Sequence, residues 1–448
     1  MSLRLLHYSD VENAYDDPER LGRLAGLIDA RRDDDTLVFG TGDNTSPGVL
    51  PLVTRGGQAI EFFDAISPDA DTFGNHDFDY GPDRAIEIIE ASPQPWLSAN
   101  VERGGETFGA PAVKRWETFD VNGTTIGAFG LTTPRTGSIN PNTGNVEFTD
   151  PIAAAEEAVD ALRAAGADYV VALSHLGRGD EELARETDVD VILGGHIHAE
   201  VVEHIDGTLL TRPGVNGEIL LEIELPAKAA TRHVVREGPL DEGVAARVRA
   251  QKREAGVHEV VAHVEQPIER TVETCFRGES RVGNFVADAY LWATGADVAL
   301  QNSGGIREGH ALEDDVTIGD LISLIPFDEP LAIARVEGAR LREAFAQGGD
   351  ELGFGEPGWW HAHIAGASLE YDRRTGTLSN VTVQGDPIDD ERRYTLAVSD
   401  YVLHSSDEFP ALTEADRLEL GDTQYEVLAA YAREHGIDPR IEGRVVLR

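Results

Sequence analysis

Short apolar runs alternate with amphipathic stretches through the first half of the chain, and this alternation restricts the possible folds more than any other feature. The apolar runs predict buried strands at residues 3–9, 36–42, 125–131, 169–174 and 190–195 and in the segment that ends at 71–73. The amphipathic runs predict helices at residues 18–32, 82–92, 150–166 and 180–187. This order predicts an α/β domain built on a largely buried sheet. Two further apolar segments, 208–214 and 218–225, predict a hairpin that closes the sheet.

The length of 448 residues predicts two domains, because a single hydrophobic core rarely organises more than about 250–300 residues. The segment 226–259 loses the strand periodicity, carries mixed charge and contains one predicted helix at 240–255. After it, a predicted helix at 282–295 and a predicted strand at 297–303 begin a second α/β unit. We therefore expect a first domain, a linker with a helix and a second domain at residues 1–228, 229–260 and 261–448.

The charge balance is strongly acidic along the whole chain. Aspartate and glutamate number 81 against 38 lysines and arginines, which gives a formal net charge of −43. Only Lys114, Lys228 and Lys252 are lysines, so 38 minus these three leaves 35 arginines. An evenly acidic, lysine-poor composition predicts a halophilic protein, whereas an acidic face for a basic partner would gather the acids in one region. The charge also argues against sequence-independent nucleic-acid binding, which requires cations that neutralise phosphates.

Cys275 is the only cysteine, so the chain cannot form an intrachain disulfide or a cysteine-based metal site. The N-terminal segment MSLRLLHYSD leads directly into a predicted strand and lacks the long apolar stretch of a secretion signal. No segment approaches the roughly 18 apolar residues of a membrane-spanning helix. These features predict a cytoplasmic protein with no membrane partner and leave the oligomeric state open.

Five short polar motifs each follow a predicted strand, where an open α/β sheet places its ligand-binding crevice. They are SDVEN (9–13), GTGDN (40–44), FGNHDFD (73–79), LSHLG (173–177) and GGHIH (194–198). The candidate metal ligands that they supply are Asp10, Glu12, Asp43, Asn75, His175, His196 and His198. Carboxylates, imidazoles and an amide oxygen together suit divalent first-row metals. Two cations can share one bridging carboxylate, and Asp43 is the candidate for it. Such a pair can activate a water molecule and bind both the attacking and the leaving oxygen of an in-line phosphoryl displacement.

Each motif taken alone also has a structural explanation. A lone histidine after a strand, such as His175, is more often structural than a ligand. GNHD can form a turn because glycine, asparagine and aspartate are turn formers, and GGHIH can be a loop with two exposed histidines. The occurrence of all five motifs in this order, each after a predicted strand, favours the metal site.

With these motifs the chain resembles the calcineurin-like metallophosphoesterases, and among them the 5′-nucleotidases, UDP-sugar hydrolases and cyclic-nucleotide phosphodiesterases. The second half shares the resemblance through RVGNFVADA (281–289), LQNSGGIR (300–307), LIPFDEPL (324–331) and AVSDYVLHSSDEFP (397–410). The resemblance implies a four-layer α/β/β/α sandwich as the catalytic domain and a separate C-terminal α/β domain of the nucleotidase type that binds substrate.

The resemblance also implies two metal sites that share Asp43. The first ligand set is Asp10, Glu12, Asp43 and His198, and the second is Asp43, Asn75, His175 and His196. His76 with Asp79 is implied as a catalytic pair that does not bind metal, an imidazolium oriented by a carboxylate. Manganese is the expected metal at the carboxylate-rich first site, with zinc, cobalt or iron as alternatives.

Two ligand positions depart from the family pattern. Most relatives have histidine where Glu12 stands. Many nucleotidases have glutamine where His198 stands, although the wider superfamily often has histidine there. Glu12 either completes a carboxylate-rich site or points away and leaves that site weak.

Asn302, Arg307, Phe327 and Phe409 are the implied substrate-binding residues of the second domain. Asn302 and Arg307 lie in a glycine-rich turn, where an amide and a guanidinium can face a phosphate or ribose, although the arginine could instead form a structural ion pair. Phe327 and Phe409 match the family's base-stacking pair, with a role in core packing as the alternative for each.

Two further features leave the shape of this pocket open. The family usually has GGDGF where SSDEF (405–409) stands. Relatives also place an arginine just before the GN pair, and both Arg277 and Arg281 lie close to that position.

The leading hypothesis is a 5′-nucleotidase-like enzyme of nucleotide catabolism that releases phosphate by attack of a metal-activated water. A phosphodiesterase or pyrophosphohydrolase acting on cyclic or sugar nucleotides is the alternative on the same metal site. A DNA-processing nuclease is disfavoured by NSGGIR and by the acidic composition. A non-catalytic binding module would require lost ligands, and only position 12 is altered.

Overall fold

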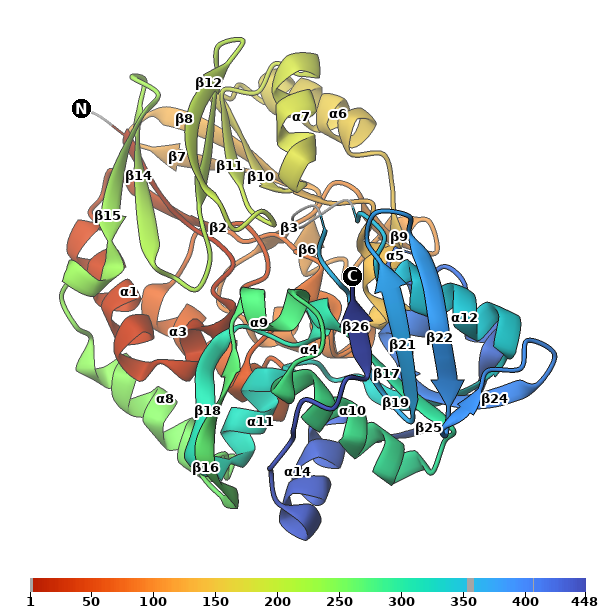
Figure 1. The fold of residues 1–448 in the computed structure, drawn as a ribbon. Coiled ribbons are helices and arrows are strands. Elements are labelled where there is room, and N and C mark those ends of the chain that lie inside the picture. The colour runs from red at the N-terminus through yellow and green to blue at the C-terminus, as the bar shows by residue number, and fades with distance from the viewer. Residues whose placement is uncertain (1–2, 353–357, 406) are drawn as a thin grey trace. The chain divides into compact units, whose positions relative to one another are not determined.

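The structure is a computed structural model that describes residues 3–352, 358–405 and 407–448. It divides into two compact units, Met1–Ala255 and Gly256–Arg448 (Figure 1). Each unit mixes helices with strands, as the alternating sequence pattern predicts.

Two sheets form the centre of the first unit. The four-stranded sheet has the order β15 (Ala229–Val234), β14 (Ile219–Leu225), β1 (Leu3–Tyr8) and β2 (Thr36–Gly40). The six-stranded sheet has the order β12 (Glu200–Ile205), β13 (Thr208–Pro213), β11 (Val191–Gly194), β10 (Tyr169–His175), β8 (Thr124–Thr132) and β7 (Trp116–Val121). β1 runs parallel to β2, with His7 opposite Phe39, and β8, β10, β11 and β13 run parallel to one another, whereas β7 and β12 at the two edges are antiparallel.

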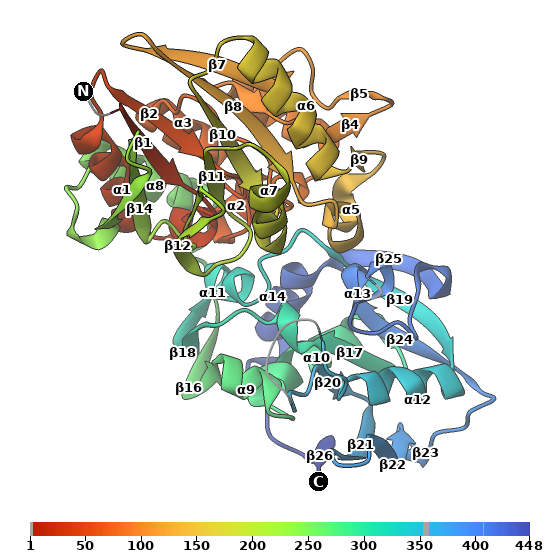
Figure 2. The ribbon, with the colours of Figure 1, turned by 90° about the horizontal axis from the view of Figure 1, so that it is seen from above.

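The two sheets pack face to face and are covered by helices on their outer sides. Leu5, Phe39, Val171 and Leu193 are buried in the layer between the sheets. The four-stranded sheet is covered by α1 (Pro18–Arg31), α3 (Gln58–Ile66) and α8 (Glu242–Glu254). The six-stranded sheet is covered by α6 (Pro151–Ala164) and α7 (Asp180–Glu186), as Figure 2 shows. The expected four-layer α/β/β/α sandwich is confirmed.

Local signals set the beginnings of the covering helices. Asp17 caps α1 by accepting hydrogen bonds from two backbone N–H groups of the first turn, and Pro18 follows it. Asp150 and Pro151 begin α6 in the same way. Proline suits the first helical position because its missing N–H would have no partner within the helix.

The expected hairpin of residues 208–214 and 218–225 is wrong. β13 pairs with β11 and β12 in the six-stranded sheet, whereas β14 pairs with β1 and β15 in the four-stranded sheet. Gly214, Asn216 and Gly217 have positive φ angles and carry the chain from one sheet to the other. Both strands are central in their sheets, so each needs a hydrogen-bonding partner on both sides.

Two other segments differ from their expected structure. Residues 70 and 71 form only isolated bridges, Phe39 with Ala70 and Asp71 with Trp96, in place of the strand expected to end at 71–73. The helix expected at 240–255 is present as α8, but it packs against α1 and α3, and β15 pairs with β14. The part of the expected linker before Gly256 is therefore folded into the first unit.

Three sheets are present among the described residues of the second unit. The five-stranded sheet has the order β20 (Ala362–Ala365), β17 (Val298–Asn302), β24 (Arg393–Ser399), β19 (Pro330–Glu337) and β25 (Arg417–Thr423). The four-stranded sheet has the order β23 (Asp386–Pro387), β22 (Thr377–Val383), β21 (Ala367–Asp372) and β26 (Val445–Leu447). The remaining pair is β16 (Val260–Arg270) with β18 (Gly309–Thr317).

Two hydrophobic cores lie on opposite faces of the five-stranded sheet. Ala299 of β17 belongs to one core, with α10 (Arg281–Thr294), α11 (Ile318–Leu324) and α14 (Gln424–His435). Val298 and Leu300 belong to the other, with α12 (Gly338–Gln347) and the four-stranded sheet. This alternation follows from the two-residue period of a strand. Among the described residues of both units, no helix combines the length and apolar character needed to cross a membrane.

Candidate metal centre

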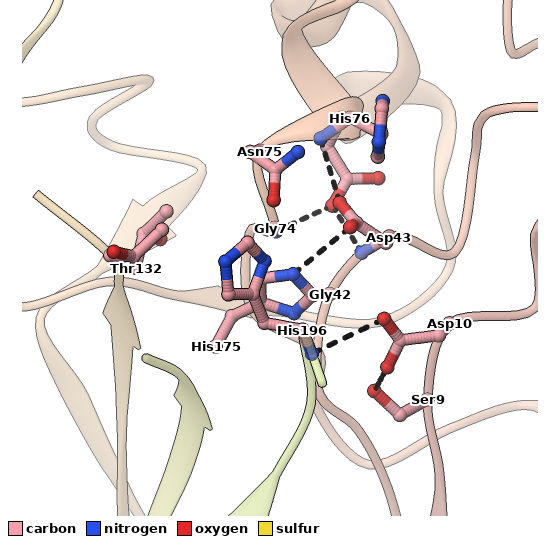
Figure 3. Close-up of polar contacts among 12 residues, drawn as sticks. Ser9, Asp10, Gly42, Asp43, Gly74, Asn75, His76, Thr132, His175 and His196 are labelled. Atoms are coloured by element: carbon pink, nitrogen blue, oxygen red, sulfur yellow. Dashed lines mark hydrogen bonds and ion pairs between the residues drawn. The ribbon is translucent and has the colours of Figure 1, made fainter. Parts of the chain in front are cut away.

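The metal-binding motifs follow the carboxyl ends of β1, β2, β10 and β11, as the sequence predicts. Asp10, Glu12, Asp43 and His196 have φ angles of 48°, 41°, 51° and 71°, in the left-handed region. Residues other than glycine adopt this region only where the surrounding structure holds them there. The chain therefore turns sharply after these strands and directs the side chains toward one another (Figure 3).

Asp10, Glu12 and His198 form the first donor cluster, with ligand atoms all within 4.8 Å of one another. Nε2 of His198 lies 3.1 Å from Oε1 of Glu12 and 3.9 Å from Oδ1 of Asp10. Oε1 of Glu12 is buried and has no hydrogen-bond partner among the described residues. The Glu12 side chain thus faces the cluster, as a ligand at this position must.

Asp43, His175 and His196 form the second cluster, again with ligand atoms within 4.8 Å of one another. Nε2 of His175 lies 3.0 Å from Oδ2 of Asp43 in an ion pair that is not aligned as a hydrogen bond. Figure 3 shows the Asn75 side chain beside these residues. Within the described chain, Oδ1 of Asn75 and Nε2 of His175 are buried without a hydrogen-bond partner.

These atoms fit divalent cations. A buried polar atom with no partner in the described chain, such as Oδ1 of Asn75, costs about 1–3 kcal/mol, and Oε1 of Glu12 and Nε2 of His175 have ion-pair contacts with His198 and Asp43 but no hydrogen bond there. Carboxylate, amide and imidazole donors are a mixed oxygen and nitrogen set of the kind that divalent first-row metals accept. Calcineurin-like phosphoesterases use divalent metals, and the donors present here suit them.

The electrostatics of the second cluster also favour positive charge beside the carboxylates. Burial by itself would lower the pKa of His175, but Asp43 and Asp10 outweigh it and raise the pKa to about 10. Burial and the charge on His175 lower the pKa of His196 to about 3, which leaves its ring neutral. A cation bound between these residues would take the place of the proton on His175, because imidazole binds metal in its neutral form.

His76 and Asp79 form the expected pair. Nδ1 of His76 lies 3.0 and 3.1 Å from the two oxygens of Asp79. Asp79 also accepts hydrogen bonds from the Ser46 hydroxyl at 2.7 Å and from the Asn140 amide at 2.9 Å, so its position is fixed. Burial opposes protonation of His76, but Asp79 and Asp43 raise its pKa to about 10. The ring is therefore an oriented imidazolium beside the second cluster.

Sequence reasoning missed two buried aspartates that hold the ligand-bearing loops, Asp71 and Asp77. Asp71 accepts hydrogen bonds from the Tyr8 hydroxyl at 2.9 Å, the Asn44 amide at 3.1 Å and the backbone N–H of Gly42 at 3.3 Å. The sequence signal for Asp71 was a charged residue in a segment predicted to be a buried strand. Charged side chains are rarely buried unless they are paired or hydrogen-bonded.

Asp77 joins the loop of Asp43 to the loop of Asn75. It accepts hydrogen bonds from the backbone N–H groups of Asp43 at 2.9 Å and Gly74 at 2.7 Å. The loops also approach so closely that a Cβ at Gly42 would lie 2.4 Å from the backbone nitrogen of Gly74. Glycine is therefore required at position 42, where φ is +85°.

The four expected substrate residues have different surroundings, and Asn302 is buried. Asn302 ends β17, and its amide donates a 2.9 Å hydrogen bond to Oε1 of Glu408. The guanidinium carbon of Arg307 lies 4.9 Å from the ring centroid of Phe327, a cation–π contact. Phe327 is partly buried, so part of its ring remains accessible.

Phe409 does not match its expected role. Its side chain is fully buried in the core beside α12, with Val402, Leu403 and Leu412. A base-stacking ring needs an open face, and a residue buried on all sides has none. The sequence also missed Tyr401, a partly buried aromatic residue in the same motif as Phe409. Ser406, in the SSDEF segment, lies outside the described residues.

The two candidate arginines before the GN pair have different surroundings. Arg281 donates hydrogen bonds to the backbone carbonyls of Pro439 at 3.0 Å and Pro267 at 2.9 Å. The Arg277 side chain is 61% exposed and forms a 3.7 Å ion pair with Glu273. Arg281 is thus held by the fold, whereas the Arg277 side chain is exposed.

A two-sheet sandwich that brings this donor set together defines a metal-dependent phosphoesterase. The family model of the calcineurin-like phosphoesterases matches residues 3–200, and the model of the 5′-nucleotidase C-terminal domain matches residues 260–414. The chain belongs to the calcineurin-like phosphoesterases, in the branch whose second domain is the 5′-nucleotidase C-terminal domain. Members of this family are hydrolases.

Known relatives and solved structures agree with this assignment. The chain is 27% identical to the trifunctional nucleotide phosphoesterase protein YfkN of Bacillus subtilis (strain 168), over 99% of this chain and 35% of that protein. It thus spans about a third of that relative. It is 24% identical to the 5′-nucleotidase of Diplobatis ommata, over 93% of this chain and 82% of the relative. A 5′-nucleotidase precursor from Thermus thermophilus superposes with a TM-score of 0.81 at 25% identity, covering 100% of this chain and 99% of that one.

Proposed function

We propose that the chain releases phosphate from nucleotides as a two-metal, 5′-nucleotidase-like phosphohydrolase. The observation that carries this proposal is the convergence of two donor clusters with three buried ligand atoms that lack a hydrogen bond within the described chain, in a protein whose second domain is of the nucleotidase type. One cation would be held by Asp10, Glu12, Asp43 and His198. The other would be held by Asp43, Asn75, His175 and His196.

The chain's own residues would position and stabilise the reacting phosphate. Cations in the two sites would supply the Lewis acidity that activates water and neutralises phosphoryl charge. His76 would place its imidazolium against the charge that develops on the phosphoryl oxygens, and Asp79 would keep the ring protonated and oriented. The buried Asp71 and Asp77 would hold the ligand-bearing loops in place.

Manganese is the metal we propose for the first site. Glu12 makes that site rich in carboxylate oxygen, and oxygen ligands favour manganese over softer metals. Elemental analysis of protein loaded from an equimolar mixture of manganese, zinc, cobalt and iron tests this choice. Two manganese equivalents, or one at the Glu12 site, would support it, and retention of a single zinc would overturn the two-metal proposal.

Turnover of a substrate panel tests the proposed activity. The metal-loaded enzyme should release phosphate from nucleoside 5′-monophosphates, and chelation followed by metal restoration should remove and restore the activity. A protein that hydrolyses a small aryl phosphate but no nucleotide would overturn the nucleotidase assignment.

A phosphodiesterase or pyrophosphohydrolase acting on cyclic or sugar nucleotides is the second candidate. YfkN is named a trifunctional nucleotide phosphoesterase, which describes more than one activity, and that protein matches almost the whole of this chain. Cyclic nucleotides and a UDP-sugar in the same panel distinguish the two candidates by their relative kcat/KM.

The acidic composition supports a halophilic origin, and the single cysteine agrees with a cytoplasmic location. Multimolar salt screens repulsion between surface carboxylates, since the Debye length falls to about 3 Å at 1 M. Activity and unfolding temperature should therefore both rise between dilute buffer and multimolar KCl. An unfolding temperature that falls with salt would contradict the halophilic proposal.

A further inference from the structure

His7 is a buried histidine in the layer between the two sheets of the first unit. On β1 it shares a face with Leu3 and Leu5, because alternate residues of a strand point to the same side. The whole residue is buried, like these two leucines. The apolar face of β1 therefore ends in an imidazole, three residues before the candidate metal ligand Asp10.

Each ring nitrogen of His7 contacts a hydroxyl, and the two hydroxyls belong to different sheets. Nε2 lies 3.0 Å from the hydroxyl oxygen of Thr41, directly after β2, and Nδ1 lies 3.1 Å from the hydroxyl oxygen of Thr211 on β13. Thr211 lies on the same face of β13 as Leu209, which is also buried between the sheets. A single ring thus links the four-stranded sheet to the six-stranded sheet.

The directions of these hydrogen bonds follow from the neighbouring groups. Burial lowers the pKa of His7 to about 3, so the ring is neutral, and one nitrogen donates while the other accepts. The Thr211 hydroxyl donates to the Ile192 carbonyl at 3.5 Å, which leaves its oxygen to accept from Nδ1–H of His7. Nε2 of His7 then accepts from the Thr41 hydroxyl. Every polar atom of this link has a partner, and a buried network that is fully satisfied is rigid.

Thr41 connects the link to the metal ligands. Its backbone carbonyl accepts a 2.7 Å hydrogen bond from Nδ1 of His175, and Nε2 of the same ring lies 3.0 Å from Oδ2 of Asp43. A metal-binding histidine usually donates its second ring N–H to such an oxygen, which fixes the orientation of the ring. Because Thr41 stands two positions before Asp43, the residue that His7 holds lies next to ligands from both sheets.

Stability alone does not require a histidine at position 7. An imidazole and two hydroxyls lose their hydration on burial, and the hydrogen bonds that replace it give only a modest net stabilisation. An apolar side chain would extend the layer that Leu5 and Leu209 already form. The candidate ligands, however, are carried by two different sheets, so their separation depends on how the sheets are fixed to each other at this edge.

Building on the proposed two-metal function, we propose that His7 is a positioning residue for the metal centre. By joining Thr41 to Thr211, its ring ties the two sheets together beside the ligand-bearing loops. Asp43 on one sheet is thereby held at a fixed separation from His175 on the other. His7 itself contacts neither cation nor substrate.

Two matched variants on β13 test this link. Thr211→Val removes the hydroxyl that bonds His7, and Thr208→Val removes a buried hydroxyl that donates a 2.7 Å hydrogen bond to the Val189 carbonyl. Both variants lose a buried hydrogen bond at nearly constant shape, so their unfolding midpoints should fall by similar amounts. In calorimetric titration, Thr211→Val should bind Mn²⁺ about 10-fold more weakly, the lower end of the effect of residues that orient metal ligands. Thr208→Val should bind Mn²⁺ as the wild type does.

Electron paramagnetic resonance gives a readout that loss of stability does not change. Two Mn²⁺ ions that share the Asp43 carboxylate are magnetically coupled, and the coupling depends on their separation. With both sites saturated, the spectrum should therefore change in Thr211→Val and keep the wild-type form in Thr208→Val.

Substitutions of His7 provide a test by conservative rescue. His7→Leu removes both hydrogen bonds, whereas His7→Gln keeps one donor and one acceptor in its amide group. His7→Gln should therefore bind Mn²⁺ more tightly than His7→Leu. If His7→Leu does not fold, the two threonine variants decide the question by themselves.

The possible failures are distinguishable. Equal Mn²⁺ affinities and identical spectra in Thr211→Val and Thr208→Val would overturn the role of His7 and leave the two-metal function standing. A wild-type protein that binds fewer than two Mn²⁺ ions would overturn the two-metal function, and the role of His7 with it.

Discussion

Replacing Asp71 by asparagine tests whether the buried network supports the metal centre. Asp71 accepts hydrogen bonds from the Tyr8 hydroxyl at 2.9 Å, the Asn44 amide at 3.1 Å and the Gly42 backbone at 3.3 Å. Oδ1 of Asn44 in turn accepts a 3.3 Å hydrogen bond from the backbone N–H of Val11. One hydrogen-bond network therefore connects Asp71 to the loop that carries Asp10 and to the loop that carries Asp43.

The expected magnitude follows from these contacts. Asparagine keeps the shape of Asp71 but replaces one acceptor oxygen by an amide donor, so either the Tyr8 hydroxyl or the backbone N–H groups of Gly42 and Thr72 lose their acceptor. That loss should lower the free energy of unfolding by about 1–3 kcal/mol. Residues that hold metal ligands in place typically contribute about 10–100-fold to metal affinity, and we expect a loss in that range for Asp71→Asn.

Asp69→Asn is a matched control two residues away. Oδ2 of Asp69 accepts a 2.7 Å hydrogen bond from the backbone N–H of Val38, within β2 and away from the ligand-bearing loops. Chemical denaturation in the presence of a chelator measures stability, and calorimetric titration with manganese measures affinity. Both variants should be destabilised, but only Asp71→Asn should lose metal affinity. Equal metal affinities in the two variants would refute the supporting role of Asp71.

Further predictions concern individual side chains. His76→Ala should lower kcat by about 10²–10³ with metal content unchanged, because it removes a preorganised charge; loss of a metal ion would show that the role is misassigned. Glu12→Ala should lose one of two metal equivalents by elemental analysis, and retention of both would show that Glu12 is not a ligand. Phe327→Ala should raise KM for a nucleoside monophosphate several-fold with little effect on p-nitrophenyl phosphate, and parallel loss on both substrates would indicate core packing. Phe409→Ala should instead cost about 3–5 kcal/mol of stability, which thermal and chemical unfolding would measure.

Local signals in the sequence predict the candidate metal ligands. Asp10 and Asp43 follow the parallel strands β1 and β2 of the four-stranded sheet, and His175 and His196 lie at or after the ends of the parallel strands β10 and β11 of the six-stranded sheet. Residue type and strand position therefore predict each pair, and the packing of the two sheets brings the pairs together. The two clusters contain only expected ligands, with Glu12 directed toward His198.

The pairing of strands was harder to predict. Residues 208–213 and 219–225 are both apolar and close in sequence, which is also the pattern of a hairpin, yet each strand pairs in a different sheet. Periodicity identifies a strand but does not specify its partners, because any apolar strand can fill a vacant position in a sheet.

The sequence by itself determined the α/β alternation, the order of the ligand-bearing loops and the residue types of a metal centre. Only the tertiary structure decided that Asp71 supports those loops, that Phe409 is buried in the core and that Glu408 faces Asn302. These outcomes depend on contacts between residues far apart in the chain, such as the 106 positions between Asn302 and Glu408. A side chain becomes a ligand, a support or core packing according to what the folded chain places around it, and local sequence does not contain that information.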